Sequence, residues 1–147
     1  MRSTMPIIGL AFLFLTMSVP FTPSAFGAEN WILIDQNNDS GFFYDRDSKS
    51  VPTVGVVRVT TRVVYTDQGK VEALKTLGTV PESAELHETR YVYDIDCEER
   101  EARLLASTHL DKSGGILKST DLGIFTEWEY LLPQTRMALV AQEACGQ

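Results

Sequence analysis

The chain has 147 residues, with 13 lysines and arginines against 20 aspartates and glutamates, for a net charge of −7. This balance excludes a basic nucleic-acid-binding surface as the main feature of the protein. The composition is 44% hydrophobic and 10% aromatic, which excludes intrinsic disorder as the main state, and the length suits one domain.

The first 28 residues have the three parts of a secretory signal peptide. A positive charge at Arg2 precedes an apolar run of 13 residues, Ile7–Val19, and prolines and small residues follow it. A helix of that length rises about 20 Å, short of the roughly 30 Å hydrocarbon core, which disfavours a membrane anchor. We expect cleavage after Gly27 or Ala28 and one domain over residues 29–147. Because Arg2 is the only charged residue in the leader, that domain carries 12 basic and 20 acidic residues, a net charge of −8.

The first half of the domain has strand patterns. Residues 31–35 and 42–45 are predicted to form a short hairpin around a polar turn. Residues 54–66 are rich in β-branched side chains, which favour a long central strand. In that strand Arg58 and Arg62 share one face, because side chains alternate between the two faces of a sheet.

Two less regular segments follow the long strand. Residues 70–77 fit one or two helical turns that end at Gly78, although their apolar residues barely define a stripe. Residues 81–88 are predicted to form a surface loop.

The second half of the domain is predicted to form an antiparallel meander. Residues 91–97 alternate, with one face formed by Tyr91, Tyr93, Ile95 and Cys97. Residues 101–110 are expected to alternate without interruption, with one face formed by Ala102, Leu104, Ala106, Thr108 and Leu110. A glycine-containing turn at residues 111–115 leads to a third strand over residues 116–120.

The last segment changes to a helical period. Its apolar positions follow the spacing i, i+3, i+4, i+7 and i+8 at Met137, Val140, Ala141, Ala144 and Cys145. Pro133 precedes the pattern and Gly146 follows it, as is usual at helix ends. A helix of about twelve residues is marginal alone in water, so the sheet must hold it in place.

The two cysteines, Cys97 and Cys145, both lie in the predicted domain and are expected to form one disulfide in an oxidising compartment. Their separation of 48 positions excludes a redox Cys-x-x-Cys motif. A zinc site with His87 and His109 is the alternative, but neither histidine has the spacing of such a site. The disulfide would clamp the last helix onto the buried face of the sheet.

One acidic turn imitates the beginning of a calcium-binding loop through Asp35, Asn37 and Asp39. The imitation fails at the sixth position, Ser40, where calcium loops have glycine, and at the twelfth, Arg46, where they have glutamate. A hairpin turn rich in Asn and Asp is therefore the favoured interpretation, and no metal is expected.

Hydrolase chemistry has one candidate group, formed by Ser107, His109 and Asp111. In a strand these side chains share a face at intervals of about 6.8 Å, which is too long for direct hydrogen bonds. An exposed polar strand face is the favoured interpretation, so we expect no catalytic residues, no cofactor and no enzyme activity.

The two arginines of the long strand could bind an anionic ligand. Pairing of Arg58 and Arg62 with Asp94 or Asp96 on a neighbouring strand is the favoured alternative, because opposite charges across a strand pair stabilise a sheet.

A series of marks in chain order resembles a known family. They are an early Trp, an aromatic-aromatic-Asp motif followed by Ser, a valine-rich strand, a strand ending in Cys before basic residues, a Gly turn, a Trp before a Pro, and a terminal helix reaching a second Cys. The residues are Trp31, Phe43, Tyr44, Asp45, Ser48, Cys97, Arg100, Arg103, Gly114, Gly115, Trp128, Pro133 and Cys145. Together they resemble the surface-adhesin protein E family of Gram-negative bacteria across essentially the whole domain.

The resemblance implies an α+β fold, with an antiparallel sheet of about six strands covered by a C-terminal helix and tethered through Cys97 and Cys145. It also implies an exported, non-enzymatic binding domain, since family namesakes bind host matrix proteins such as vitronectin and laminin and can dimerise. A periplasmic scaffold or envelope-stress protein without an extracellular ligand is the alternative, and a small hydrolase using His109 is the third hypothesis.

Overall fold

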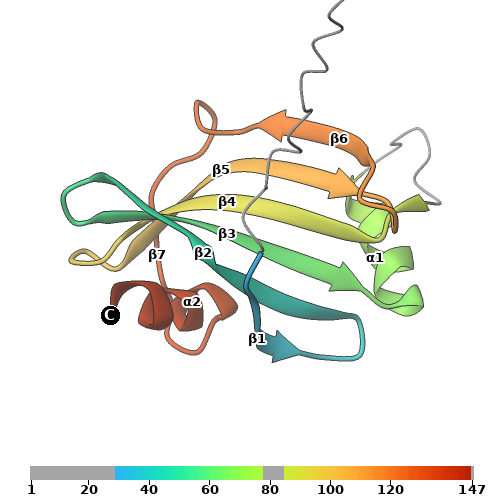
Figure 1. The fold of residues 1–147 in the computed structure, drawn as a ribbon, viewed down its shortest axis with the longest axis horizontal. Coiled ribbons are helices and arrows are strands. Elements are labelled where there is room, and N and C mark those ends of the chain that lie inside the picture. The colour runs from blue at the N-terminus through green and yellow to red at the C-terminus, as the bar shows by residue number, and fades with distance from the viewer. Residues whose placement is uncertain (1–28, 78–84, 147) are drawn as a thin grey trace, which may run out of the picture.

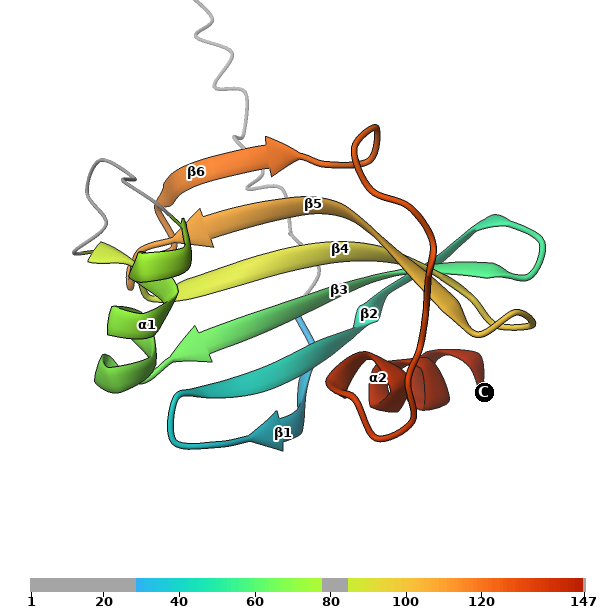
Figure 2. The same ribbon diagram turned by 180° about the vertical axis from the view of Figure 1, so that it is seen from behind.

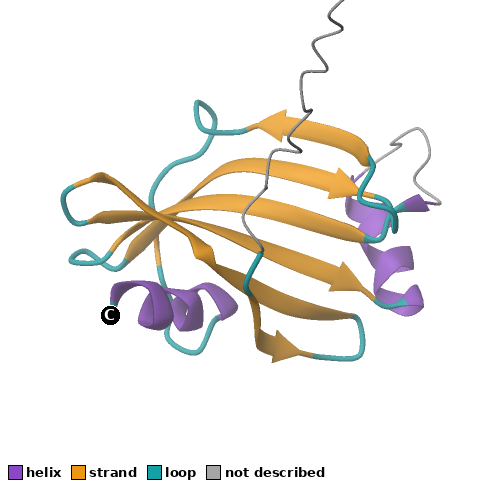
Figure 3. Cartoon of the chain, in the orientation of Figure 1, coloured by secondary structure: helices purple, strands orange, loops and turns teal. Residues whose placement is uncertain are grey.

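A computed structural model describes residues 29–77 and 85–146, which form one antiparallel sheet with two helices (Figures 1 and 3). Six strands lie side by side in chain order: β1 (Trp31–Gln36), β2 (Ser40–Thr53), β3 (Val56–Tyr65), β4 (Glu88–Asp96), β5 (Glu101–Leu110) and β6 (Ile116–Asp121). A seventh, β7 (Glu129–Tyr130), pairs with the beginning of β5. The helices are α1 (Asp67–Leu77) and α2 (Arg136–Cys145). The predicted fold class is confirmed.

Strand alternation gives the sheet two different faces. In the register of β3 and β4, Val57 lies opposite Ile95 and Val59 opposite Tyr93. These side chains join the hydrophobic core with α2, and Val59 and Ile95 are fully buried. We call this side the helix-side face. The alternate residues of β3, among them Arg58, point to the opposite side, which we call the outer face.

Helix α2 begins at a capped residue and buries small side chains. The hydroxyl of Thr135 accepts a hydrogen bond from the backbone N–H of Ala138 at 3.2 Å, which satisfies one of the free donors of the first turn. Ala138, Val140 and Ala144 are buried, and the two alanines let the helix approach the sheet closely. The contacts of α2 concentrate on β1, β2 and β3, near one end of the sheet (Figure 2).

A bulge in β5 overturns the predicted uninterrupted alternation of that strand. Tyr93 pairs with Leu104, whereas Val92 pairs with Ala106, so Leu105 is an extra residue between the two pairs. One inserted residue moves every later side chain to the other face of the sheet. Beyond the bulge Ser107 and His109 therefore point to the helix-side face, and Ala106, Thr108 and Leu110 do not share a face with Leu104.

Helix α1 is longer than the predicted turns of residues 70–77, because it begins at Asp67. Its start lies against the turn between β1 and β2, where a Cβ on Gly69 would come within 1.9 Å of the carbonyl oxygen of Asp39. Only glycine fits such a close approach. Residues 81–84 of the predicted surface loop lie outside the described residues. In the described part the prediction is wrong, because Leu86 is only 4% exposed and Glu88 begins β4. Neither α1 nor α2 is long and apolar enough to cross a membrane.

Strand β2 also extends well beyond the predicted residues 42–45. Its pairing with β3 is irregular between Asp45 and Ser50 and resumes to the tip of the hairpin, where Thr53 lies opposite Val56. The two-residue loop includes Gly55 at a φ of 82°, a conformation that glycine adopts without strain.

Candidate functional site

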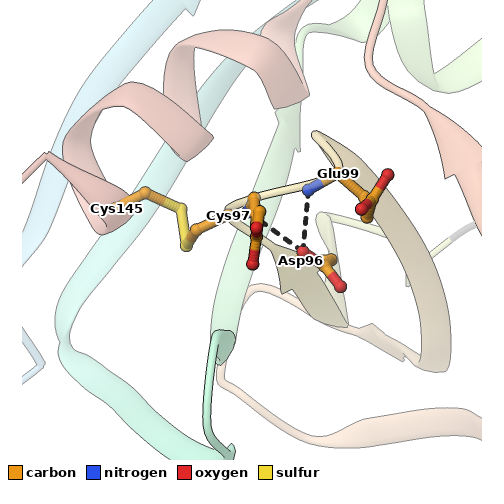
Figure 4. The surroundings of a disulfide bond; sticks show 5 residues. Asp96, Cys97, Glu99 and Cys145 are labelled. Atoms are coloured by element: carbon orange, nitrogen blue, oxygen red, sulfur yellow. Dashed lines mark hydrogen bonds between the residues drawn. A yellow bond between two sulfur atoms is a disulfide. The ribbon is translucent and has the colours of Figure 1, made fainter.

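Cys97 and Cys145 form a disulfide that joins the end of β4 to the last residue of α2 (Figure 4). Their Cα atoms lie 5.7 Å apart. The carboxylate of Asp96 shapes the adjoining turn by accepting hydrogen bonds from the backbone N–H groups of Glu98 at 3.0 Å and Glu99 at 2.9 Å. The helix tether expected from the sequence is therefore present, and both cysteines are committed to structure.

His109 belongs to a polar chain on the helix-side face. The Tyr65 hydroxyl donates to Thr89 Oγ1 at 3.0 Å, and Thr89 Oγ1 lies 2.8 Å from Nδ1 of His109. If Tyr65 donates, the Thr89 hydroxyl is free to donate onward, so Nδ1 accepts and the ring proton lies on Nε2. The arrangement holds a neutral imidazole and uses one of its two nitrogens for structure.

The Ser107, His109 and Asp111 group is not assembled for hydrolysis. The carboxylate of Asp111 accepts from the backbone N–H groups of Ser113 at 2.8 Å and Gly115 at 2.7 Å, closing the turn between β5 and β6. His109 is oriented by a threonine instead of an acid. The expected exposure of this strand face is wrong, because Ser107 and His109 are only 8% and 5% exposed. The bulge in β5 turned both toward the interior.

Burial lowers the pKa of His109 below its ordinary value of 6.5, and the positive charge of Lys118 lowers it further. The unfolded chain therefore binds more protons than the folded one between the two pKa values. The stability that neutral His109 contributes is complete above 6.5 and is lost as pH falls through 6.5 toward the folded-state value.

We expect the free energy of unfolding to fall more steeply between about pH 7.5 and pH 5 in the parent than in the His109→Gln variant. Denaturant unfolding at a series of pH values measures both slopes. Equal slopes in the parent and His109→Gln would contradict the assignment.

The first acid on the outer face, Asp94, is buried and shared by two arginines. Arg58 contacts it with two nitrogens at 2.7 and 3.0 Å, and Arg103 lies 3.7 Å away. The Arg103 guanidinium also lies 5.2 Å from the ring centroid of Trp128. The expected pairing of Arg58 with Asp94 is confirmed, and the guanidinium fork is used within the sheet instead of on an external anion.

The second acid of the outer face is Glu88, which pairs with Arg62 in place of the predicted Asp94 or Asp96. In the register of β3 and β4, Arg62 lies opposite Arg90, so a nearby carboxylate is needed between these like charges. Glu88 contacts Arg62 at 3.3 Å and Arg90 at 2.7 Å. Arg62 is also held between two rings, 4.4 Å from Trp31 and 4.9 Å from Phe43. Pairing of Arg62 with Asp94 or Asp96 was the wrong expectation.

The acidic segment at Asp35–Asp39 forms the turn between β1 and β2. The side-chain oxygen of Asn37 accepts from the backbone N–H groups of Asp39 and Ser40, each at 2.9 Å. Asp35 is paired with Arg136 at the start of α2, at 2.7 Å. The turn interpretation is confirmed, and the described parts of the chain contain no group of three acidic, His or Cys side chains placed to hold a metal ion.

Exposed apolar side chains gather in residues 122–135, which we call the crossing segment. It leaves β6, adds β7 to the sheet and crosses to α2 (Figure 2). Of nine large hydrophobic side chains exposed in the described residues, four lie here: Ile124 (85% exposed), Phe125 (76%), Tyr130 (58%) and Leu132 (63%). This surface was not predicted from the sequence. The adjacent apolar residues Ile124 and Phe125, which fit neither a strand period nor a helix period, could have indicated it.

Backbone hydrogen bonds hold the beginning of the crossing segment in one conformation. The N–H of Leu122 donates to the carbonyl of Leu105, the extra residue of the bulge, at 2.8 Å, and the N–H of Phe125 donates to the carbonyl of Leu122 at 2.9 Å. The Thr126 hydroxyl donates to the carbonyls of Leu104 and Leu122. The bulge that redirects His109 thus also anchors the loop that presents Phe125.

A cavity of about 400 Å³ lies between the crossing segment and the helix-side face. Its walls include the half-buried side chains of Tyr93, Leu104 and Met137, and its rim includes the exposed carboxylates of Glu127 and Glu129. Burial raises the pKa of the Tyr93 hydroxyl, and the negative charge of Glu129 raises it further. This hydroxyl therefore stays protonated and available as a hydrogen-bond donor.

The sequence matches no family model and no curated protein. The fold does match solved structures of protein E from Haemophilus influenzae. A second crystal form of that protein aligns over 88% of this chain and 97% of its own, with a TM-score of 0.58 and 17% identity. This chain has the protein E fold. Another structure of H. influenzae protein E aligns over 85% of this chain and 90% of its own, with a TM-score of 0.57 and 16% identity. Protein E from a non-typeable strain aligns over 87% of this chain and 83% of its own, with a TM-score of 0.55 and 15% identity.

The likeness to protein E bears out the resemblance drawn from the sequence at the level of fold. It extends over 85–88% of this chain and 90–97% of the protein E chains. At 15–17% identity the likeness concerns the backbone arrangement, and no residue role is transferred from protein E to this chain.

Proposed function

We propose that residues 1–28 are a secretory signal peptide and that residues 29–147 act as an exported, non-enzymatic domain that binds a protein ligand. The observation that carries the proposal is the protein E fold, shared over 88% of this chain and 97% of the other. Combined with the family resemblance of the sequence, this fold makes host matrix proteins such as vitronectin or laminin the ligands to test first.

The arrangement of the polar groups supports binding over catalysis. The imidazole and the carboxylate of the candidate hydrolase group are committed elsewhere: His109 to Thr89, and Asp111 to its own turn. A nucleophile needs a base within hydrogen-bond reach and an acid that orients the base. The described residues supply the base without that acid.

The net charge of −8 indicates the character of the partner. A basic surface on the ligand would be attracted over long range, and this attraction weakens as salt screens it. The domain is proposed to work in the periplasm or on the outer cell surface, and a weak homodimer through an exposed sheet edge is part of the proposal.

Surface plasmon resonance against immobilised vitronectin and laminin tests the proposal. We expect saturable binding that weakens with rising salt, and equal binding by the His109→Gln variant. Protease treatment of intact cells locates the protein: a surface domain is cut, and a periplasmic one is protected. Turnover in a hydrolase panel that disappears with His109→Gln would overturn the proposal, and absence of both binding and turnover would favour the periplasmic scaffold.

A further inference from the structure

The crossing segment combines an apolar wedge with two carboxylates. The wedge is formed by Ile124 and Phe125, which are 85% and 76% exposed on a loop fixed by backbone hydrogen bonds. Glu127 and Glu129 follow directly and make no ion pair with any residue in the described parts of the chain. A folded domain that exposes two adjacent large apolar side chains to water has a surface suited to a partner.

The cavity beside the wedge accepts a long side chain with a positive end. Its volume of about 400 Å³ lies within the range of small binding pockets. Tyr93, Leu104 and Met137 offer apolar walls along which the methylene stem of a lysine or arginine can lie. Glu127 and Glu129 stand at the rim, where the charged end of such a side chain would emerge. The ring of Tyr130, also at the rim, can add a cation–π contact.

We propose that the crossing segment is the partner-binding surface of the domain and that it takes a protein segment in which basic and apolar side chains alternate. Apolar groups of the partner cover Ile124 and Phe125, and a lysine or arginine enters the cavity beside Glu127 and Glu129. This inference rests on the proposed protein-binding function and names the surface and the chemistry of the partner.

The charges around the wedge disfavour two other partners, an anionic lipid surface and a second copy of this chain. An anionic lipid surface would be repelled by Asp121, Glu127 and Glu129, which surround the two apolar side chains in the sequence, and by the net charge of −8. In a symmetric pair of copies, the same carboxylates would face one another, because a two-fold interface brings each patch against itself. A basic protein partner avoids both repulsions, because its positive charges would attract these carboxylates.

The probe is an acetylated eight-residue peptide that alternates lysine with leucine or phenylalanine. Its control is the same peptide with glutamate in place of lysine. Titration of each into the isotope-labelled protein, followed by amide NMR shifts, locates the binding site. We expect shifts concentrated in residues 122–135 with the lysine peptide only.

Two pairs of substitutions separate the apolar and electrostatic contributions. Ile124→Ser with Phe125→Ser is expected to weaken the peptide Kd by about tenfold or more, as for residues central to an interface. Glu127→Gln with Glu129→Gln is expected to weaken it about three- to tenfold at low salt, with a smaller effect at high salt. Two matched controls should stay within about twofold. They are Val51→Ser with Val54→Ser, which removes two other exposed apolar side chains, and Glu98→Gln with Glu99→Gln, which removes two other exposed carboxylates.

The outcomes separate this inference from the proposed function. Peptide binding at the crossing segment without vitronectin or laminin binding supports the surface and rejects those ligands. Matrix-protein binding that neither the wedge nor the carboxylate variant weakens overturns the surface and leaves the proposed function standing. Co-sedimentation with phosphatidylglycerol vesicles, or self-association, that needs Ile124 and Phe125 while the peptide does not bind assigns the wedge to a membrane or to a second copy and overturns the inference.

Discussion

Removal of the Cys97–Cys145 disulfide is expected to lower the free energy of unfolding by about 4 kcal/mol. The bond closes a ring across 48 sequence positions, and in the chain-entropy model a ring of that size restricts the unfolded chain by about this amount. Small domains have a total stability of about 5–15 kcal/mol, so the loss is a large share. Denaturant unfolding of the Cys97→Ser/Cys145→Ser variant against the oxidised parent measures it.

The control for this prediction is the parent with its disulfide reduced. If the effect comes from the link itself, reduced parent and double variant should unfold at the same denaturant concentration. Intact mass under non-reducing conditions should also show the loss of two hydrogens in protein purified without reductant. An unfolding curve that reductant leaves unchanged would contradict the prediction, as would two free thiols in the purified protein.

The Ile95→Ala variant should lose about 2–5 kcal/mol, because it leaves a cavity in the centre of the core. Ile95 is fully buried, and its neighbours in the sheet are Val57 on β3 and Ala102 on β5, both also buried. Ala102 is too small to fill the space that three missing carbons would leave. The free energy of unfolding by denaturant gives the size of the loss.

The same substitution at Ile116 is the matched control, since it lies in β6 of the same sheet with 69% of its surface exposed. Both variants lose the strand preference of a β-branched residue, so their difference isolates burial. We expect Ile116→Ala to stay within about 0.5 kcal/mol of the parent. Equal losses at the two positions would mean that the core is not where the structure places it.

The residues that stabilise the domain are separate from those of the proposed binding surface. The core lies under α2 around Ile95 and is closed by the disulfide. The crossing segment ends at Thr135, the N-cap of α2, and is anchored to the bulge in β5 through Leu105. Changes to the exposed Ile124 or Glu127 should therefore alter binding with little effect on stability.

Local pattern was sufficient for most of the architecture. The period of two in β3 and β4 and the helical period of α2 each reflect a face that must be buried, so the sequence alone determined these elements. The cysteine pairing followed as well, because two cysteines in one expected exported domain leave one intramolecular partner each. The order of marks from Trp31 to Cys145 led to the resemblance to protein E, and the likeness to its solved structures confirms the fold.

Only the tertiary structure decided where the polar and exposed apolar groups lie. The bulge at Leu105 is a one-residue event that no period reveals, yet it turns His109 inward and supplies the carbonyl that anchors Leu122. The partner of Arg62 depended on register, which places it opposite Arg90 and makes Glu88 the bridging acid. Strand and helix periods follow from one element burying one face, whereas bulges, register and loop anchoring arise from contacts between distant segments.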